Sequence, residues 1–530
     1  MACMKKYFFS GLPDNNSKSV IGENDIFIFF VTFAFGLVIH GYRFFNSIFS
    51  HDSLLIYQND DNWQISLGRF LQPVYLQIRG RACAPLLIGI LALFFLTVSI
   101  ALIVRLTEIE SKLSIVLICG ILVINPSFSM SAATYIDWLD IYMLCCLLNV
   151  FAVYLCKKYK WGIAVGIICI AASMALYQAY IQIAVAFIII LLVKDILTCK
   201  TFKRVFTDTI KFGIMMVTAA IIYYASYKLV LKYTGIVPTD AGNGMNNSFS
   251  VLKSLNIDII LSTYAATLSQ FFLPGFARQG FHVISTFDIF INALLFVTAA
   301  IEGCFLIRKK RIKAINIVLL ALIFLIMPFA INVSDFLSGC NGHILTIYSV
   351  YFVYVLVILI LEIFCKEVKD KGILAKKLLI KIVAISLICL QFENMVYTNQ
   401  LYLKKDFDYQ TTISNITKLT DRMECEDGYI VGETPVLFVG DFASNDSLRA
   451  ERPYFDRIDG VGANETYNMS ITSSVNLKQY FENVLAYPVN YLDEEKSSEM
   501  CELEEVKEMP EFPSNGSVKF IDKVLVVKLS

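Results

Sequence analysis

The sequence predicts an all-α polytopic membrane protein of about eleven transmembrane helices, with a small extracytoplasmic α/β domain at its C-terminus. Of its 530 residues, 57% are hydrophobic and only 17% are charged, whereas a soluble domain carries roughly a quarter charged residues. The mean hydropathy is +0.63. Long apolar runs recur between residues 25 and 397, and each can cover the roughly 30 Å hydrocarbon core of a bilayer. A transmembrane β-barrel would show short alternating segments instead.

The apolar runs place the expected spans along the chain. No small-residue cleavage site follows the first run, which favours a retained span over a signal peptide. Two runs are short and could be tilted, half-inserted or fused with a neighbour. The spans are expected at 24–41, 84–105, 112–125, 138–156, 161–176, 178–194, 212–233, 288–307, 314–332, 344–364 and 378–397.

Lysine and arginine alternate between the connections. Lysine or arginine residues cluster in 105–112, 157–160, 194–211, 308–313 and 366–377, whereas 126–137, 177 and 333–343 contain neither. Positively charged loops stay in the cytoplasm. The pattern therefore predicts a multi-pass membrane protein with its N-terminus in the cytoplasm. The connections 42–83 and 234–287 and the region 398–530 are then outside.

Residues 398–530 differ in character from the membrane domain, 1–397. Charged and polar residues become common, and the segments 411–425 and 477–487 have the periodicity of amphipathic helices. The segments 429–441 and 518–530 read as strands bounded by turn residues. These elements predict a compact α/β domain.

The first outer connection, 42–83, holds an unusual number of ionisable groups. A carboxylate at the mouth of a membrane cavity can act as general base toward a sugar hydroxyl, and arginines can bind a phosphate leaving group through two hydrogen bonds. A solvated loop with ordinary helix caps is the alternative. The candidate catalytic residues are Asp52, Asp60 and Asp61, the candidate phosphate-binding residues are Arg69, Arg79 and Arg81, and His51 is a candidate substrate ligand.

Further polar residues are expected at the outer ends of other spans. Ionisable groups there are functional candidates if they face a cavity, although helix capping and interface anchoring explain such residues equally well. The additional candidates for substrate binding are Asp137, Asp140, Tyr177, Gln178, Arg278, His282 and His343.

In pattern, these segments resemble the bacterial membrane glucosyltransferases of the Gtr type-two family, which glucosylate O-antigen and other surface polysaccharides. His51-Asp52 followed by Gly68-Arg69 is similar to the family's "HDD … GRW" element, with Ser53 in place of the second Asp and Phe70 in place of Trp. The segments SAATYIDWLDIY, 131–142, and SMALYQAY, 173–180, are similar to two further family segments, and the run 409–440 also looks familiar. The resemblance follows the same order over most of the chain.

The resemblance implies a GT-C-like glycosyltransferase that takes sugar from a polyprenyl-phosphate donor at the outer leaflet. By the family's pattern, Asp52 would be the catalytic carboxylate and Arg69 would contact the donor phosphate. Ser53 leaves open whether Asp60 or Asp61 assists. The expected acceptor is a surface glycan of the O-antigen, capsule or teichoic-acid type, and the remaining partner is the lipid bilayer.

Other classes of function are weighed against this one. The sequence contains no glycine-rich loop of the kind that binds phosphates, so a nucleotide-sugar donor is not supported. Binding to nucleic acid is not expected. A lipid-linked-sugar transporter or flippase would place polar groups near the midplane of several spans, but the apolar runs contain few. A non-catalytic glycan assembly protein is a further alternative. No cofactor is required, although the clustered carboxylates permit a divalent metal ion.

Overall fold

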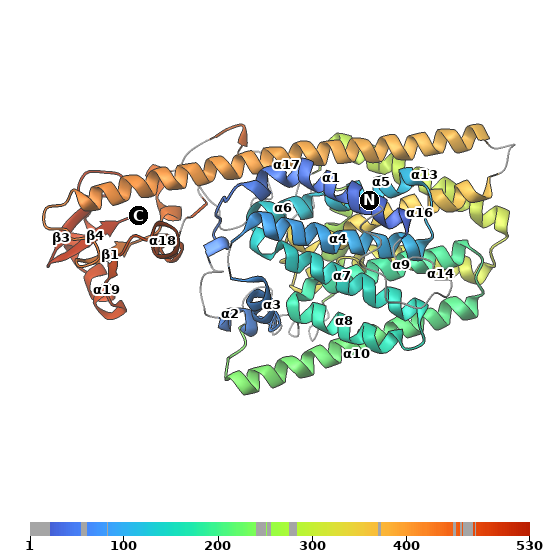
Figure 1. The fold of residues 1–530 in the computed structure, drawn as a ribbon, viewed down its shortest axis with the longest axis horizontal. Coiled ribbons are helices and arrows are strands. Elements are labelled where there is room, and N and C mark those ends of the chain that lie inside the picture. The colour runs from blue at the N-terminus through green and yellow to red at the C-terminus, as the bar shows by residue number, and fades with distance from the viewer. Residues whose placement is uncertain are drawn as a thin grey trace, which may run out of the picture.

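The computed structural model describes residues 22–54, 61–81, 83–239, 248, 251, 256–274, 284–368, 373–448, 452–455, 458, 470–471 and 473–530. It confirms a predominantly helical membrane protein with a small C-terminal sheet (Figure 1). Within this part of the chain, eight helices are long and apolar enough to cross a bilayer. They are α1 (Glu23–Phe45), α4 (Pro85–Thr107), α7 (Ile136–Lys158), α9 (Ile181–Leu197) with η3 (Gln178–Tyr180), α10 (Phe202–Thr234), α13 (Thr286–Lys310), α16 (Phe352–Glu367) with η6 (Tyr348–Tyr351), and α17 (Ile373–Glu424).

The other three predicted spans also form helices, but shorter ones. They are α5 (Lys112–Val123), α8 (Gly162–Leu176) and α14 (Ala314–Ala330). The 12 residues of α5 rise only about 18 Å, and the chain then bends by 42° into α6 (Pro126–Thr134). Asn125 causes this break, because its side chain accepts a hydrogen bond from the Phe128 amide at 2.9 Å and caps α6 ahead of Pro126. Taken as one bent span, α5 and α6 would be the ninth.

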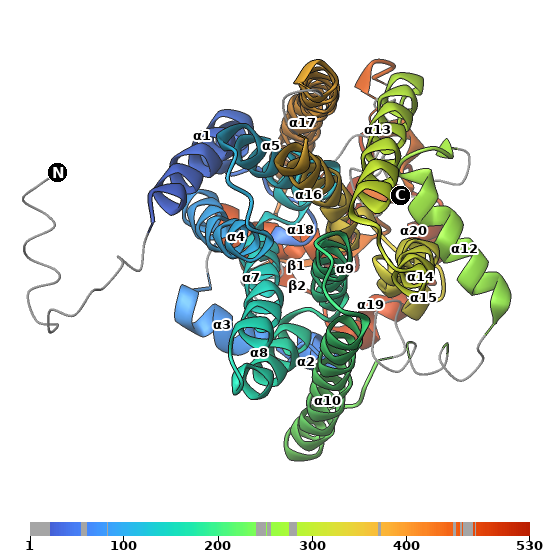
Figure 2. The same cartoon turned by 90° about the vertical axis from the view of Figure 1, so that its right-hand side faces the viewer.

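Helices α9 and α16 form the centre of the bundle. They are buried over 83% and 89% of their apolar windows, and the end-on view shows the other helices arranged around them (Figure 2). Both sequences are almost continuously apolar, which is the pattern of a helix that meets protein on all sides. The core of the membrane domain therefore lies between α9, α16, α7 and α4.

The lysine- and arginine-rich connections meet at one end of the bundle, which we call the basic end. Ion pairs link them, among them Lys194 with Glu108 at 3.0 Å, Lys366 with Glu110 at 3.1 Å, and Lys310 with Glu367 at 2.9 Å. The alternating charge pattern thus corresponds to a real segregation of loops. The described parts of the first connection, 46–54, 61–81 and 83–84, lie at the opposite end with 135, 177 and 331–347.

Helix α17 runs along the whole length of the molecule and carries the C-terminal domain beyond that opposite end (Figure 1). Its sheet contains β1 (Pro435–Val439), β2 (Asn490–Tyr491), β3 (Val518–Ile521) and β4 (Val524–Lys528) in the order β2-β1-β4-β3. Strand β1 is parallel to β2 and β4, and β3 pairs antiparallel with β4. Asp522 and Lys523, both at positive φ, form the tight turn between β3 and β4.

Helices α18 (Ser474–Tyr480), α19 (Glu494–Cys501) and α20 (Glu504–Lys507) complete the domain. A separate hydrophobic core joins it to α17, in which Ile416, Leu419 and Met423 pack with Leu525 and Val527 of β4. The strand predicted at 429–441 is confirmed in shorter form as β1, whereas the segment 518–530 forms two strands, β3 and β4, instead of one. The helix predicted at 477–487 is also confirmed, and α18 ends in a single π-helical turn at Phe481–Leu485. Strand β2 was not predicted.

Two elements differ from the expectation. The helix predicted at 411–425 is the end of α17 and not a separate element, because no glycine or proline interrupts residues 373–424. The expected boundary near residue 397 falls inside that helix. The expected loop 234–287 contains α12 (Ile257–Ser269), which begins where the Asn256 side chain accepts a hydrogen bond from the Asp258 amide at 2.8 Å.

Candidate active site

The segment 46–54, which carries His51 and Asp52, is fastened to the helix bundle. The fully buried guanidinium of Arg43 in α1 donates to the carbonyls of Ala133, Asn46 and Ile48 at 3.2, 2.8 and 2.7 Å. The Ser50 hydroxyl donates to the Thr134 carbonyl at 2.5 Å. Because both anchors involve α6, the bend between α5 and α6 fixes where this segment lies.

The C-terminal domain covers the other side of the same segment. Leu54 is fully buried in the core that α17 shares with the sheet. The Phe49 ring packs against Tyr409 and Tyr480, with ring centres 5.9 and 6.3 Å apart, and the Asn476 side chain of α18 donates to the His51 carbonyl at 3.1 Å. His51 and Asp52 therefore lie at the junction between the bundle and the C-terminal domain.

Asp52 is partly open to solvent and lies beside His51. Its carboxylate is 26% exposed and its Oδ1 is 3.4 Å from Nε2 of His51. The His51 ring meets Tyr135 edge-on at 5.7 Å, and Tyr135 meets His343 in the same way at 5.9 Å. Burial, with a smaller contribution from the charge of His51, lowers the pKa of His343 to about 4. His343 is therefore neutral at physiological pH.

A tight turn between α2 (Asn62–Ser66) and α3 (Gln72–Arg79) presents Arg69. Gly68 has a φ of +91°, a conformation that an L-residue with a Cβ rarely adopts. The turn carbonyls accept three hydrogen bonds: Tyr223 to Gly68 at 3.0 Å, Gln178 to Leu67 at 2.7 Å, and Tyr227 to Ser66 at 2.7 Å. Helix α10 and the start of η3 thus hold the turn from two sides.

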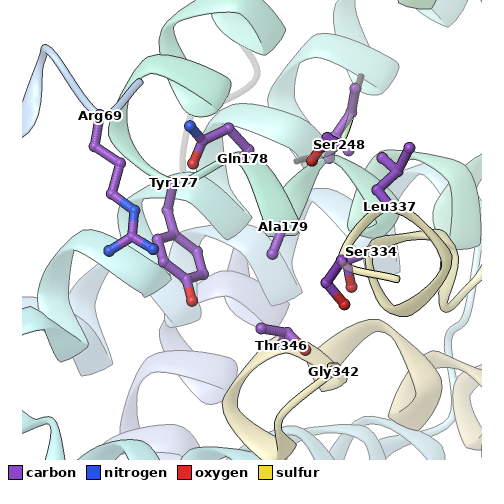
Figure 3. Close-up of a pocket in the computed structure, with 11 residues that line it drawn as sticks. Arg69, Tyr177, Gln178, Ala179, Ser248, Ser334, Leu337, Gly342 and Thr346 are labelled. Carbon is purple, nitrogen blue, oxygen red and sulfur yellow. The ribbon is translucent and has the colours of Figure 1, made fainter. Parts of the chain in front are cut away.

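Arg69 reaches from this turn into a pocket of about 510 Å³, counting the space open at its mouth. Its guanidinium lies 4.6 Å from the centre of the Tyr177 ring, and its buried Nε has no hydrogen-bond partner among the described residues. Figure 3 shows Arg69 and Tyr177 on one side of the pocket and Ser334, Gly342 and Thr346 on the other. The latter three belong to α15 (Val333–Leu337), the turn that follows it, and η5 (Ile344–Thr346).

Asp52 and Arg69 act on the same phenol. Burial raises the pKa of Tyr177, the positive charge of Arg69 opposes that rise, and the negative charge of Asp52 adds to it. The Asp52 carboxylate and the Arg69 guanidinium are 17 positions apart in the sequence. In the folded protein, their charges have opposite effects on the pKa of the same tyrosine. This arrangement offers a proton acceptor and an anion-binding group within one site.

Arg79 and Asp140 form a buried ion pair beside this pocket. Nη1 of Arg79 lies 2.8 Å from Oδ1 of Asp140 and donates to the Asp137 carbonyl at 2.7 Å. Tyr75 donates to the second oxygen of Asp140 at 2.8 Å. Asp137 is fully buried. The neighbouring groups that stabilise its negative charge are Cys83, Ser53, Arg43 and Arg79. Ser53, which replaces the family's second Asp, therefore lies against an existing buried carboxylate.

The remaining candidate residues either form an ion pair away from the Arg69 pocket or lie outside the described part of the chain. Arg81 pairs with Asp61 at 2.6 Å, and both side chains are about a fifth to a quarter exposed. Asp60, Arg278 and His282 lie outside the described residues. Among those that are described, no group of three or more His, Cys, Asp or Glu side chains could hold a metal ion.

Several pocket residues were not predicted from the sequence. Ser334, Gly342 and Thr346 come from a segment more than 260 positions beyond Arg69, and no local signal connects the two. Tyr135 stands within the quoted segment 131–142, but it resembles an ordinary interface anchor there. Tyr223 and Tyr227, which hold the Arg69 turn from α10, were also not predicted, because their spacing of four is that of any packed helix face.

Comparison with known proteins places the chain in a family. The model of the family described as Glucosyl transferase GtrII matches residues 41–361, which is more than half of the sequence. The chain belongs to the glucosyl transferase GtrII family. Among curated proteins and solved structures, none matches it.

Membership in the GtrII family makes the protein a membrane glucosyltransferase. The matched range begins two residues before Arg43 and ends within α16. It therefore contains Asp52, Arg69, Tyr177 and His343, whereas α17 and the C-terminal sheet lie beyond it. The site described above is thus built from the part of the chain that the family model matches, and the C-terminal domain packs against its segment 46–54.

Proposed function

We propose that this GtrII protein transfers a glucosyl, or more generally a hexosyl, residue from a polyprenyl-phosphate donor to a cell-surface glycan on the outer face of the bacterial inner membrane. The observation that carries the proposal is that Arg69 lies over the Tyr177 ring in a pocket, while the charge of Asp52 acts on the same tyrosine. One group can take a proton and the other can bind a phosphate, and glycosyl transfer from a sugar phosphate needs both.

In the proposed reaction, the Asp52 carboxylate accepts the proton of an acceptor hydroxyl. The oxygen of that hydroxyl attacks the anomeric carbon of the donor sugar, and the bond between that carbon and the phosphate oxygen breaks. Arg69 stabilises the negative charge that the departing polyprenyl phosphate gains. Tyr177 supports the guanidinium by its ring face. His51, in contact with Asp52, orients the carboxylate.

The arrangement of loops supports an outer-face site. The pocket lies at the end of the bundle opposite the basic end, and positively charged connections stay in the cytoplasm. A polyprenyl phosphate can enter such a pocket sideways from the bilayer, while a glycan approaches from the aqueous side. Arg79 and Arg81 already pair with Asp140 and Asp61, so Arg69 is the arginine best disposed to bind the donor phosphate.

Two other functions fit a membrane protein of this family less well. A lipid-linked-sugar flippase needs a polar route across the membrane, whereas the residues described here gather at one end. A non-catalytic assembly protein needs no general base, so the pairing of Asp52 with His51 would have no purpose.

The proposed function is tested by reconstituting the purified protein in liposomes with polyprenyl-phosphate glucose and the surface polysaccharide from a strain that lacks the gene. We expect transfer of glucose from the lipid-linked donor and none from a nucleotide-linked glucose. Transfer from the nucleotide sugar alone would contradict the donor assignment. Compositional analysis of surface glycans with and without the gene identifies the acceptor through the branch sugar that is lost.

A further inference from the structure

The wall of the pocket that faces Arg69 comes from α15, the turn that follows it and η5 (Figure 3). We call this wall, residues 334–346, the hydroxyl wall. The volume of about 510 Å³ lies in the range of small-molecule sites. Of the described residues that line the pocket, only Arg69 has a charged side chain. The pocket therefore fits an anion on the side of Arg69 and a neutral group on the side of the hydroxyl wall. The lining residues of the hydroxyl wall are Ser334, Leu337, Ser338, Gly342 and Thr346.

The backbone of the hydroxyl wall is fixed from behind. The buried side chain of Gln182 in α9 accepts a hydrogen bond from the Ser334 amide at 3.1 Å and donates one to the Thr346 carbonyl, so it joins the two ends of the wall. The fully buried carboxylate of Asp335 accepts from the Gly342 amide at 3.1 Å. A Cβ on Gly342 would collide with this carboxylate. The wall is thus held without the use of the Ser334 hydroxyl.

The hydroxyl groups of the wall differ in whether the protein uses them. The Ser338 hydroxyl donates to the Asp335 carbonyl at 2.9 Å, and the Thr346 hydroxyl donates to the His343 carbonyl at 2.7 Å. The Ser334 hydroxyl is buried and has no hydrogen-bond partner among the described residues. An unpaired buried hydroxyl costs free energy unless something else bonds it. Ser334 is therefore the residue of this wall whose hydroxyl is left for a ligand.

The chemistry of the hydroxyl wall matches that of a sugar. Ser334 can donate and accept a hydrogen bond, and the oxygens of Ser338 and Thr346 can still accept one. The apolar side chain of Leu337 lies between these groups in the sequence and lines the same pocket. A sugar hydroxyl is itself both donor and acceptor, and the C–H groups of a pyranose fit an apolar neighbour. A hydrocarbon chain in this place would leave the Ser334 hydroxyl unpaired, and a second anionic group would find no cation there.

The hydroxyl wall is also connected to the segment that carries the proposed general base. His343, which belongs to the wall segment, meets the Tyr135 ring edge-on at 5.9 Å, and Tyr135 meets His51 in the same way at 5.7 Å. His51 lies 3.4 Å from the Asp52 carboxylate. These contacts relate the position of the wall to that of Asp52. A group held by the wall and by Arg69 is thus held in a fixed relation to the general base.

We propose that the hydroxyl wall recognises the sugar of the lipid-linked donor, and that Ser334 hydrogen-bonds one of its hydroxyls. This inference rests on the proposed function, since it assigns the sugar-binding part of the same pocket. Selectivity for the sugar then depends on Ser334, whereas affinity for the phosphate depends on Arg69.

The test uses the full-length protein and a set of polyprenyl-phosphate donors whose glucose lacks one hydroxyl at a time. Ser334→Ala removes the unpaired hydroxyl but keeps the amide that bonds Gln182, so we expect it to fold, and thermal unfolding in detergent verifies this. Ser517→Ala is the matched control. The Ser517 hydroxyl is likewise buried without a partner among the described residues, but it belongs to the C-terminal domain.

The transfer assay measures kcat/KM for each donor with the native surface polysaccharide as acceptor. For the wild type, we expect a loss of roughly tenfold with one of the deoxy donors, the effect of a single lost hydrogen bond. Ser334→Ala should lose roughly tenfold with the complete donor and show no further loss with that same deoxy donor. Ser517→Ala should match the wild type with every donor.

The binding assay is made without acceptor and compares polyprenyl-phosphate glucose with polyprenyl phosphate. We expect Ser334→Ala to weaken binding of the glucose-bearing lipid roughly tenfold and to bind polyprenyl phosphate as the wild type does. Equal weakening of both lipids would overturn the proposal, because it would assign Ser334 to the phosphate and not to the sugar.

The two assays separate this proposal from the proposed function. If the wild type transfers no sugar but prefers the glucose-bearing lipid, and Ser334→Ala removes that preference, the sugar-binding assignment stands and the enzymatic one fails. If the wild type transfers sugar and Ser334→Ala keeps both its kcat/KM and its discrimination against every deoxy donor, the enzymatic assignment stands and the hydroxyl wall does not recognise the sugar.

Discussion

The guanidinium of Arg69 lies over the ring of Tyr177, 4.6 Å from its centre. This contact joins the first connecting loop to the junction of α8 and η3, two segments more than 100 positions apart. It leaves Nε of Arg69 buried without a partner in the described part of the chain. A buried donor of this kind is costly unless a ligand satisfies it, so the contact links the packing of the loop to the binding of an anion.

Replacing Arg69 should impair the use of donor. Arg69→Ala is expected to lower kcat/KM for the lipid-linked donor roughly 100- to 1000-fold, the range for removing one preorganised donor from a charged transition state. Arg69→Lys should retain only part of the wild-type kcat/KM, because an ammonium group cannot form two parallel hydrogen bonds with a phosphate. Initial rates at varied donor concentration measure both. Lys228→Ala is the control, since Lys228 makes a comparable contact with Tyr224, at 5.5 Å, away from the pocket, and its rates should equal those of the wild type.

The turn that presents Arg69 depends on glycine. Gly68→Ala forces an L-residue to a φ of +91°, which costs roughly 1–2 kcal/mol. We expect a lower midpoint of thermal unfolding and a lower transfer rate, since the turn relaxes and moves Arg69. In contrast, Gly213→Ala in α10 has open space around its new Cβ and should stabilise the protein by up to about 1 kcal/mol. Equal stability of Gly68→Ala and wild type would refute the role of this turn.

The buried pair of Arg79 and Asp140 is expected to stabilise the fold. Asp140→Asn leaves a buried guanidinium without its counter-charge, which should lower the free energy of unfolding by roughly 3–5 kcal/mol. The double variant Arg79→Met with Asp140→Asn removes both charges and should be more stable than Asp140→Asn alone. Thermal unfolding of the four proteins in one detergent forms a double-mutant cycle. Strictly additive losses would show that the two side chains do not interact.

His343 should make stability depend on pH. Its folded pKa of about 4 lies below the ordinary value of 6.5. Between these values the unfolded chain binds a proton that the folded protein excludes, so stability falls as the pH falls from 6.5 toward 4. The slope is at most about 1.4 kcal/mol for each pH unit. His343→Gln should remove the contribution of His343 to this loss of stability at low pH. Identical pH profiles of unfolding for variant and wild type would contradict the burial of a neutral His343.

The sequence predicts the fold better than it predicts the site. Apolar runs predicted the position of all eight long apolar helices because hydropathy is a local property, although they missed α6 and α12. The charge of the loops predicted that 108–111 and 311–313 lie at the same end. The lengths of α5 and α8 were less predictable. Asn125-Pro126 ends α5, whereas α8 ends through its packing in the bundle. The continuity of α17 was missed because its amphipathic end differs in composition from its apolar start.

For the site, the family resemblance singled out Asp52 and Arg69, and in the structure the charges of both act on Tyr177. The residue types alone could not separate Arg69 from Arg79 and Arg81, because tertiary packing brings Asp140 and Asp61 to the latter two. The sequence could not predict that Ser334 and Thr346 line the pocket, because they reach it only through the turn after α14. Asp137 was a candidate ligand from the sequence, and its complete burial beside Ser53 is a property that only the packed bundle reveals.

The most direct test of the central claim is the rate of glucose transfer by Asp52→Asn, with polyprenyl-phosphate glucose as donor and the native surface polysaccharide as acceptor. We expect a loss of roughly 100-fold or more in kcat, with donor affinity and thermal unfolding close to those of the wild type. Asp258→Asn, at the exposed start of α12, should retain full activity. Wild-type transfer by Asp52→Asn, together with its loss in Asp61→Asn, would contradict the account and assign the general base to Asp61.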